Sequence, residues 1–79
     1  TAEYSIADIP TLHGWLGKDL KELNLRKKYG VNVIAIKRGG ALLINPSADD
    51  PTQKDDVFVL LGKNNTLKKI VNAYEAEKK

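Results

Sequence analysis

The sequence contains no cysteine and no methionine, and it has a single histidine in 79 residues. Without cysteine, neither a disulfide framework nor a thiolate zinc site can stabilise the chain, and a reducing compartment such as the cytoplasm suits it. No apolar run approaches the roughly 18 residues that span a bilayer. The start shows neither an initiator methionine nor a signal-peptide pattern. We therefore expect residues 1–79 to be a single domain excised from a longer protein.

Reactive side chains are also scarce. His13 is the only histidine and has no cysteine to pair with, so a loop or structural position is favoured over catalysis or metal ligation. Asp49, Asp50, Asp55 and Asp56 lack the Asp-x-Asp-x-Asp-Gly spacing of a calcium loop. The six glycines form neither a G-x-G-x-x-G motif nor a Walker A loop. The sequence thus predicts no catalytic residue, no metal site and no cofactor site within this domain.

The charge is unevenly distributed, although the net charge is only +3. Five basic residues gather between positions 18 and 28: Lys18, Lys21, Arg26, Lys27 and Lys28. This concentration favours a face that meets anions, but a solvated helix surface explains it equally well. The few aromatic residues are scattered along the chain, so they offer no stacking platform for general nucleic-acid binding.

The composition is that of a folded domain, with 42% apolar and 29% charged residues. The hydrophobic core of so short a chain supplies only about 3 to 5 kcal/mol by itself. We therefore expect a surface that is covered by a partner.

The first part of the chain predicts a strand and a helix. Residues 3–9 show an imperfect alternation typical of a strand, which we expect Pro10 to stop. A helix is expected to start near Gly17, because apolar residues recur at i, i+4 and i+7. These residues are Leu16, Leu20 and Leu23. Residues 25–29 suggest a further turn that ends at Gly30.

Residues 31–37 are rich in β-branched side chains and predict a strand with two largely apolar faces. One face would carry Val31, Val33 and Ala35, and the other Asn32, Ile34 and Ile36. Since so small a domain cannot usually cover both faces of a sheet with its own helices, the second face suggests a subunit contact or a ligand.

The remaining chain predicts two more strands and a final helix. Gly39 and Gly40 suit a tight hairpin turn into residues 41–45, and residues 47–55 read as an exposed polar loop. Residues 57–61 predict a buried central strand ended by a glycine. Spacing at i, i+3, i+4 and i+7 predicts an amphipathic helix capped by one of two asparagines. Gly62 is the glycine that ends the strand, and Asn64 and Asn65 are the two asparagines. The helical spacing is that of Leu67, Ile70, Val71 and Tyr74.

These elements predict an α+β fold, a small two-layer domain of order β-α-β-β-β-α with a mostly antiparallel sheet that forms a dimer. Between positions 17 and 46, an arginine could bind phosphate and an asparagine could read a nucleobase or ribose edge. Each residue has a structural alternative. Arg26 could pair with Glu22, Asn32 could face water, and Pro46 could serve merely to end a strand.

The stretch from Gly17 to Ile36 resembles the signature of the C-terminal domain of RCK proteins, the TrkA-C family. Ile44-Asn45-Pro46 and the segment from Asp56 to Gly62 are similar to the remaining strands of that family. The resemblance covers nearly the whole chain. One departure is Asp55, where the family often has glycine, and this puts the turn geometry there in doubt.

The resemblance implies a cytoplasmic domain that follows a Rossmann-like domain, forms a homodimer and regulates a membrane potassium or cation transporter. Several Gram-positive members bind cyclic di-AMP at the dimer interface. Carried over by position, Arg26 would contact phosphate and Asn32 the nucleoside. The apolar lining would comprise Leu20, Leu25, Val33 and Pro46.

Two other functions remain open from the sequence. One is a structural dimerisation module in which a second subunit fills the face of Ile34 and Ile36 without any ligand. The other is the regulatory domain of a transcription factor, which would add contact with nucleic acid through an attached domain or through the basic segment.

Overall fold

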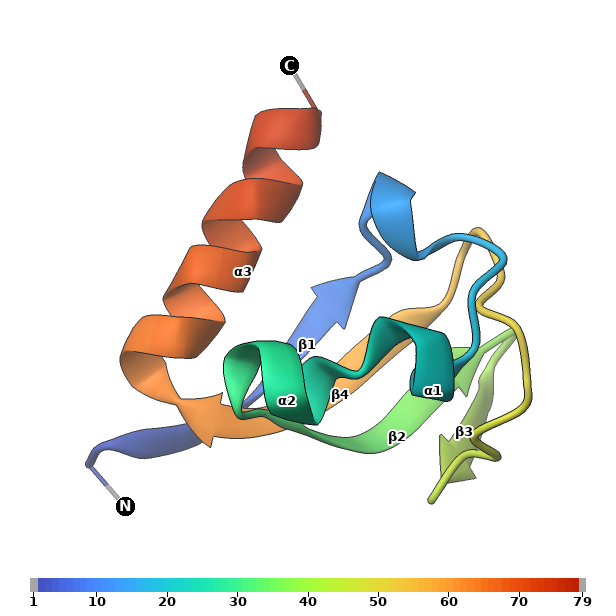
Figure 1. Cartoon of the computed structure of the whole chain (residues 1–79), viewed down its shortest axis with the longest axis horizontal. Coiled ribbons are helices and arrows are strands. Elements are labelled where there is room, and N and C mark those ends of the chain that lie inside the picture. The colour runs from blue at the N-terminus through green and yellow to red at the C-terminus, as the bar shows by residue number, and fades with distance from the viewer. Residues whose placement is uncertain (1, 79) are drawn as a thin grey trace.

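The computed structural model describes residues 2–78 and contains a four-stranded antiparallel sheet with helices against one of its faces (Figure 1). The elements are β1 (Tyr4–Pro10), the 3-10 helix η1 (His13–Trp15), α1 (Leu20–Leu23), α2 (Leu25–Tyr29), β2 (Asn32–Arg38), β3 (Ala41–Ile44), β4 (Val57–Lys63) and α3 (Asn64–Glu77). The strand order in the sheet is β1-β4-β2-β3. The predicted α+β class and order of elements are confirmed.

Strand β4 occupies an interior position in the sheet, as its apolar sequence predicts. Phe58 and Leu60 point to the helices and have no exposed surface, whereas Val57, Val59 and Leu61 alternate onto the opposite face and are half-buried. The strand continues past its predicted end through Gly62. A Cβ atom at Gly62 would lie 2.6 Å from Cγ1 of Val31, so glycine is required there by a close approach of two chain segments.

The prediction that Pro10 stops the first strand is wrong by one residue, because Pro10 pairs with Val57 as the last residue of β1. Within residues 2–78, β1 is an edge strand that pairs with β4. A proline that lacks an N–H is tolerated at such an edge.

The predicted division of β2 into two faces is also wrong beyond Val33, because the register shifts between Val33 and Ala35. Val33 pairs with Leu60, and Ile36 pairs with Phe58, so the extra residue between the pairs changes the phase of the alternation. Ile36 is consequently only 3% exposed and belongs to the core. It cannot form part of an outer face that a second subunit fills.

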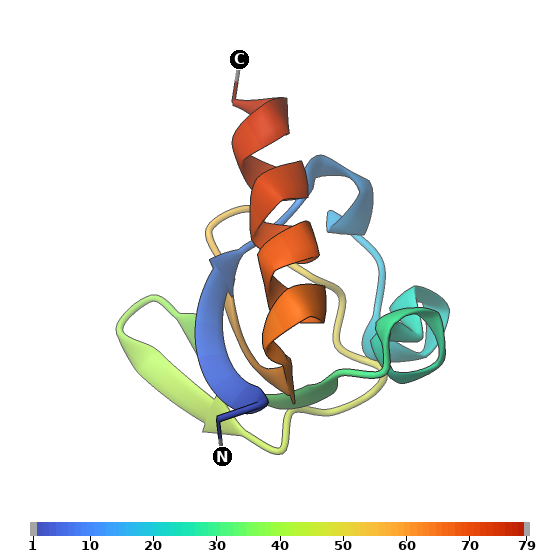
Figure 2. The same ribbon diagram turned by 90° about the vertical axis from the view of Figure 1, so that its left-hand side faces the viewer.

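An apolar face nevertheless remains uncovered, on the side of the sheet opposite the helices (Figure 2). Paired residues of neighbouring strands share a face, so the register places four exposed apolar side chains on that side of the sheet, two on each of the edge strands β1 and β3. They are Tyr4, Ile6, Leu42 and Ile44. Ile6 and Ile44 are 61% and 65% exposed. We call this surface the open face.

The helical segment begins later than predicted. Gly17 has a φ of +77°, and Leu16 is 43% exposed outside any helix. The helix α1 starts at Leu20, because the Asp19 side chain accepts a hydrogen bond from the N–H of Glu22 while the Glu22 carboxylate accepts one from the N–H of Asp19. This reciprocal capping box fixes the start of the helix more strongly than the apolar spacing does.

Two turns are formed as predicted. Gly30 ends α2 in the left-handed region with a φ of +73°. Gly39 and Gly40, with φ values of +55° and +83°, connect β2 to β3. Both conformations favour glycine, because a side chain would be strained at positive φ.

The start of α3 differs from the prediction. Asn64 is the first helical residue and Lys63 occupies the cap position, without a capping hydrogen bond from its side chain. The Asn64 amide instead accepts from the hydroxyl of Ser5 and donates to the carbonyl of Ala2. It therefore attaches the helix to the start of β1. Of the predicted apolar stripe, Leu67 and Ile70 are buried in the core and Tyr74 packs against it, whereas Val71 is 37% exposed.

The core lies between the sheet and the helices. The ring of Phe58 packs against that of Trp15, with 4.9 Å between their centroids. Around this pair lie side chains from every helix and from β1, β2 and β4. The buried set comprises Ile9, Leu12, Trp15, Leu23, Leu25, Val31, Ile36, Phe58, Leu60, Leu67 and Ile70.

The loop before β4 is not wholly exposed as predicted, because an ion-pair cluster fixes it. Asp56 is 1% exposed, and its carboxylate accepts from Nε and Nη2 of Arg38 at 2.8 and 2.7 Å. Nη1 of Arg38 also donates to Asp50, at 2.8 Å. The bond from Arg38 lowers the pKa of Asp56. Thr52 is buried too, and its hydroxyl donates to the carbonyl of Lys18.

Candidate functional site

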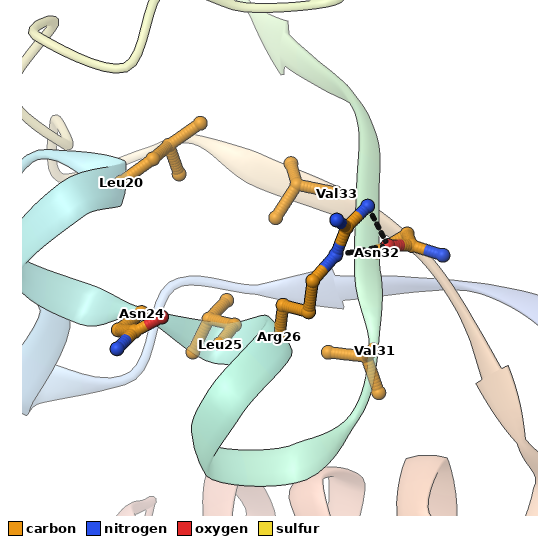
Figure 3. Close-up of a pocket in the computed structure, with 7 residues that line it drawn as sticks. All are labelled: Leu20, Asn24, Leu25, Arg26, Val31, Asn32 and Val33. Atoms are coloured by element: carbon orange, nitrogen blue, oxygen red, sulfur yellow. Dashed lines mark hydrogen bonds between the residues drawn. The ribbon is translucent and has the colours of Figure 1, made fainter.

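The predicted site residues gather where α1 and α2 face the start of β2. A hollow of about 200 Å³ is lined there by Leu20, Asn24, Leu25, Arg26, Val31, Asn32 and Val33 (Figure 3). The structure thus brings together five predicted residues: Leu20, Leu25, Arg26, Asn32 and Val33. Pro46 is not among the residues that line this hollow. We call it the Arg26 hollow.

Two left-handed residues create this arrangement. Asn24, with a φ of +46°, lies between α1 and α2, and Gly30 lies between α2 and the start of β2. Asn24 ends α1 and Gly30 ends α2, so two short helices and the start of β2 follow one another closely. Asparagine is among the few residues other than glycine that tolerate this conformation. Asn24 and Val31 were not predicted for the site, although the helix-breaking position of Asn24 is a signal that could have indicated it.

Arg26 and Asn32 are connected by two hydrogen bonds. Nε and Nη2 of Arg26 donate to Oδ1 of Asn32 at 3.0 and 2.8 Å. Figure 3 shows the guanidinium group reaching from α2 to the amide on β2. Because arginine has no acceptor, the asparagine must present its oxygen to it. The alternative pairing of Arg26 with Glu22 is not formed, since the Glu22 carboxylate accepts from the N–H of Asp19 instead.

The electrostatic character of this region is positive. Arg26, Lys27 and Lys28 occupy the last turn of α2 and are exposed. Across residues 2–78, no carboxylate lies within ion-pair distance of Arg26. Lys21, by contrast, pairs with Asp49. The Arg26 hollow therefore combines an arginine whose positive charge is not compensated, an amide and apolar walls, which together can hold an anion attached to a ring.

The acidic residues and the histidine serve other purposes. Asp50 and Asp56 bind Arg38, and the backbone N–H of His13, whose side chain is exposed, donates to the Glu77 carboxylate at 2.9 and 3.1 Å. In the part of the chain that the structure describes, no three His, Cys, Asp or Glu side chains lie close enough together to hold a metal ion. The cluster around Arg38 was missed by sequence reasoning.

Comparison with known protein families matches residues 5–74 to the TrkA-C domain. The chain belongs to this family. Ktr system potassium uptake protein C of Bacillus subtilis is 33% identical over 60 residues, which are 76% of this chain and 27% of that protein. The K(+)/H(+) antiporter subunit KhtT of B. subtilis is 40% identical over 60 residues, or 75% of this chain and 36% of that protein. The chain thus spans about a third of the length of these relatives.

Among solved structures, the RCK C domain of the potassium transport protein KtrA, in complex with cyclic diadenosine monophosphate, superposes on this TrkA-C domain with a TM-score of 0.81. The identity is 30%, and the match covers 90% of this chain and 84% of that one. The RCK_C domain of Streptococcus agalactiae BusR, at 18% identity and a TM-score of 0.73, shares the fold.

None of the helices within residues 2–78 has both the length and the apolar character needed to cross a bilayer.

Proposed function

We propose that this TrkA-C domain is a non-catalytic ligand sensor that controls potassium or cation transport, and that two copies bind cyclic di-AMP between them. The observation that carries the proposal is the Arg26 hollow, where an arginine without an acidic partner is oriented by an asparagine beside apolar side chains. The KtrA RCK C domain, 30% identical, was solved in complex with this nucleotide, which supports the choice of ligand.

The proposed contacts follow from the chemistry of each group. The guanidinium of Arg26 supplies forked donors to a phosphate, and the amide of Asn32 contacts the nucleoside. Leu20, Leu25 and Val33 cover the apolar parts of the ligand. Pro46 lies outside the Arg26 hollow of its own copy, so its proposed contact requires a ligand that extends further or a contribution from the second copy.

A dimer suits both the ligand and the domain. A dinucleotide with two phosphates has the two-fold symmetry of an isologous interface, in which each copy repeats the same contact. The open face, which carries exposed Ile6 and Ile44, gives the small domain an apolar surface available to a partner. The homodimer is therefore part of the proposal.

The wider role concerns the protein in which this domain resides. Because the chain spans about a third of its relatives, we propose a preceding Rossmann-like domain and a cytoplasmic position beside a membrane cation transporter. The ligand can control transport only if it binds two arrangements of the dimer with different affinity. A dimerisation module without ligand remains the competing function, with the open face in place of the Ile34 and Ile36 face predicted for it.

Calorimetry with cyclic di-AMP tests this function. We expect the parent domain to bind with measurable heat and a raised melting temperature. Arg26→Ala is expected to weaken binding by roughly 10- to 150-fold, because a charged hydrogen-bond partner contributes about 1.5–3 kcal/mol. Lys28→Ala removes the same charge two residues away in α2, outside the Arg26 hollow, and serves as the matched control, with at most a few-fold effect.

The outcomes separate the alternatives. Absence of heat and of any melting shift at high micromolar nucleotide would remove the ligand-sensing proposal. Dimers that form without nucleotide, together with that absence, would favour the structural module. Equal weakening by Arg26→Ala and Lys28→Ala would show a general charge effect, and would contradict the specific role of Arg26. Binding of random duplex DNA at low salt would instead indicate the nucleic-acid function.

A further inference from the structure

The loop between β3 and β4 contains a short segment, residues 50–53, that lies against the start of α1 (Figure 1). The N–H and the hydroxyl of Thr52 both donate to the carbonyl of Lys18, at 2.9 and 2.8 Å, and the N–H of Gly17 donates to the carbonyl of Thr52 at 2.9 Å. Thr52 is 4% exposed, so these three hydrogen bonds are shielded from water. We call residues 50–53 the Thr52 segment.

The Thr52 segment is itself held by the ion pair of Arg38 with Asp56. On one side of Thr52, Nη2 of Arg38 donates to the carbonyl of Pro51 at 3.3 Å. On the other side, the N–H of Gln53 donates to the carboxylate of Asp56 at 2.9 Å. The backbone on both sides of Thr52 is therefore fixed, and the segment can act as a rigid support for the residues that it contacts.

The helix α1 needs such a support, because a helix of four residues is not stable by itself. Leu23 is buried in the core, but Leu20, which forms a wall of the Arg26 hollow, is only half-buried at the first position of the helix. An ion pair between Lys21 and Asp49 also joins α1 to the loop, but both side chains are largely exposed, and such pairs contribute little. The buried hydrogen bonds of Thr52 are therefore the stronger constraint on the position of the start of α1.

We propose that Thr52 is a positioning residue for the Arg26 hollow, because it holds the carbonyl of Lys18 and thereby fixes where α1 presents Leu20. This inference rests on the proposed ligand-sensing function, although Thr52 does not line the hollow. Loss of the hydroxyl would let the start of α1 leave its position for part of the time. A site that is competent for only a fraction of the time binds more weakly in proportion to that fraction.

The test compares variants that remove or keep the hydroxyl. Thr52→Val keeps the shape of the side chain and is expected to weaken cyclic di-AMP binding roughly 2- to 13-fold, the range for the loss of one neutral hydrogen bond. Thr52→Ser keeps the hydroxyl and is expected to bind like the parent. Thr11→Val is the matched control, because the N–H and the hydroxyl of the buried Thr11 also donate to a single carbonyl, that of Asp56, at 3.2 and 2.8 Å. It should lower stability to a similar extent and leave binding unchanged.

A second measurement examines α1 without any ligand. The amides of Leu23 and Asn24 donate to the carbonyls of Asp19 and Leu20, at 3.0 and 2.9 Å, so their hydrogen exchange reports opening of this helix. In Thr52→Val, we expect these two amides to exchange roughly 2- to 13-fold faster than in the parent, measured relative to the amides of β4. In Thr11→Val, the same ratio should stay at the parental value.

The ligand function and the role of Thr52 can fail separately. If cyclic di-AMP does not bind the parent but Thr52→Val selectively speeds exchange in α1, the ligand function falls and the positioning of α1 by Thr52 stands. If the nucleotide binds and requires Arg26, but Thr52→Val binds like the parent, the function stands and the inference falls. Unchanged exchange in α1, or equal effects of Thr52→Val and Thr11→Val on α1 exchange or on binding, would also overturn the inference.

Discussion

Replacement of Asp56 by alanine is expected to leave the domain largely unfolded at 25 °C. Removing one partner of a buried ion pair costs up to about 3–5 kcal/mol, and here Arg38, 22% exposed, would keep only the half-buried Asp50 as an ionic partner within residues 2–78. Asp56 is 1% exposed and accepts two hydrogen bonds from Arg38 and one from the N–H of Gln53. The expected loss equals the roughly 3–5 kcal/mol that a core of this size supplies. Urea denaturation followed by the fluorescence of Trp15, the single tryptophan, measures it.

A neighbouring aspartate provides the matched control. Asp55 is exposed, and its carboxylate makes no ion pair within residues 2–78. Asp55→Ala is therefore expected to change the unfolding free energy by less than about 0.5 kcal/mol. The double variant Arg38→Met, Asp56→Leu removes both charges and is expected to be more stable than Asp56→Ala. Equal stability of Asp56→Ala and Asp55→Ala would contradict this account.

The same ion pair predicts how stability depends on pH. Arg38 lowers the pKa of Asp56 in the folded state, whereas an unfolded aspartate titrates near about 3.9. The stabilisation by the carboxylate is thus complete above the unfolded pKa and is lost as the pH falls through the folded pKa. We expect the unfolding free energy of the parent to decline below about pH 4. An Asp56→Asn variant, studied in the same pH series, should lack this component of the decline.

Replacement of Phe58 by alanine is expected to cost about 3–5 kcal/mol, the usual range for a fully buried aromatic side chain. Phe58 has no exposed surface and contacts the Trp15 ring near the centre of the core. The cavity would lie between β4 and the helices, where the sheet cannot move to fill it. Thermal unfolding monitored by circular dichroism should show a lowered melting temperature or no transition.

Two variants show whether burial causes the effect. Phe58→Leu keeps most of the apolar volume and is expected to lose less than half as much stability as Phe58→Ala. Ile44→Ala removes an apolar side chain that is 65% exposed, and the isolated monomer should unfold at nearly the parent temperature. A Phe58→Ala domain with parental stability would mean that the core does not depend on this residue.

Local patterns in the sequence predicted most of the elements. The glycine pair at the hairpin, Gly30 after α2 and the apolar run of β4 all form as predicted, because each signal is complete within a few residues. The bulge in β2 was not predictable in this way. It depends on how Val33 and Ile36 meet the partner strand, which alternation within one strand does not encode.

The separation of residues along the sequence also explains which site residues were predicted and which were not. All seven residues that line the Arg26 hollow, five of them predicted, lie between positions 20 and 33, so two left-handed residues are enough to bring them together. A second hollow, lined by Tyr4, Gly30, Asn32, Leu61 and Gly62, was not predicted, because Tyr4 meets Leu61 and Gly62 through the pairing of β1 with β4. The ion pair of Arg38 with Asp56 was missed for a related reason, since 18 positions separate the two residues.

The partner of Arg26 is a neutral amide, and this has a consequence for assembly kinetics and salt dependence. The guanidinium keeps its full charge, so in the proposed dimer two like charges would converge whenever the nucleotide is absent. Their repulsion would oppose the empty dimer and would be relieved by the two phosphates. Added salt screens both interactions. Higher ionic strength should therefore strengthen the association of empty subunits and weaken the binding of the dianionic ligand. The two equilibria would shift in opposite directions.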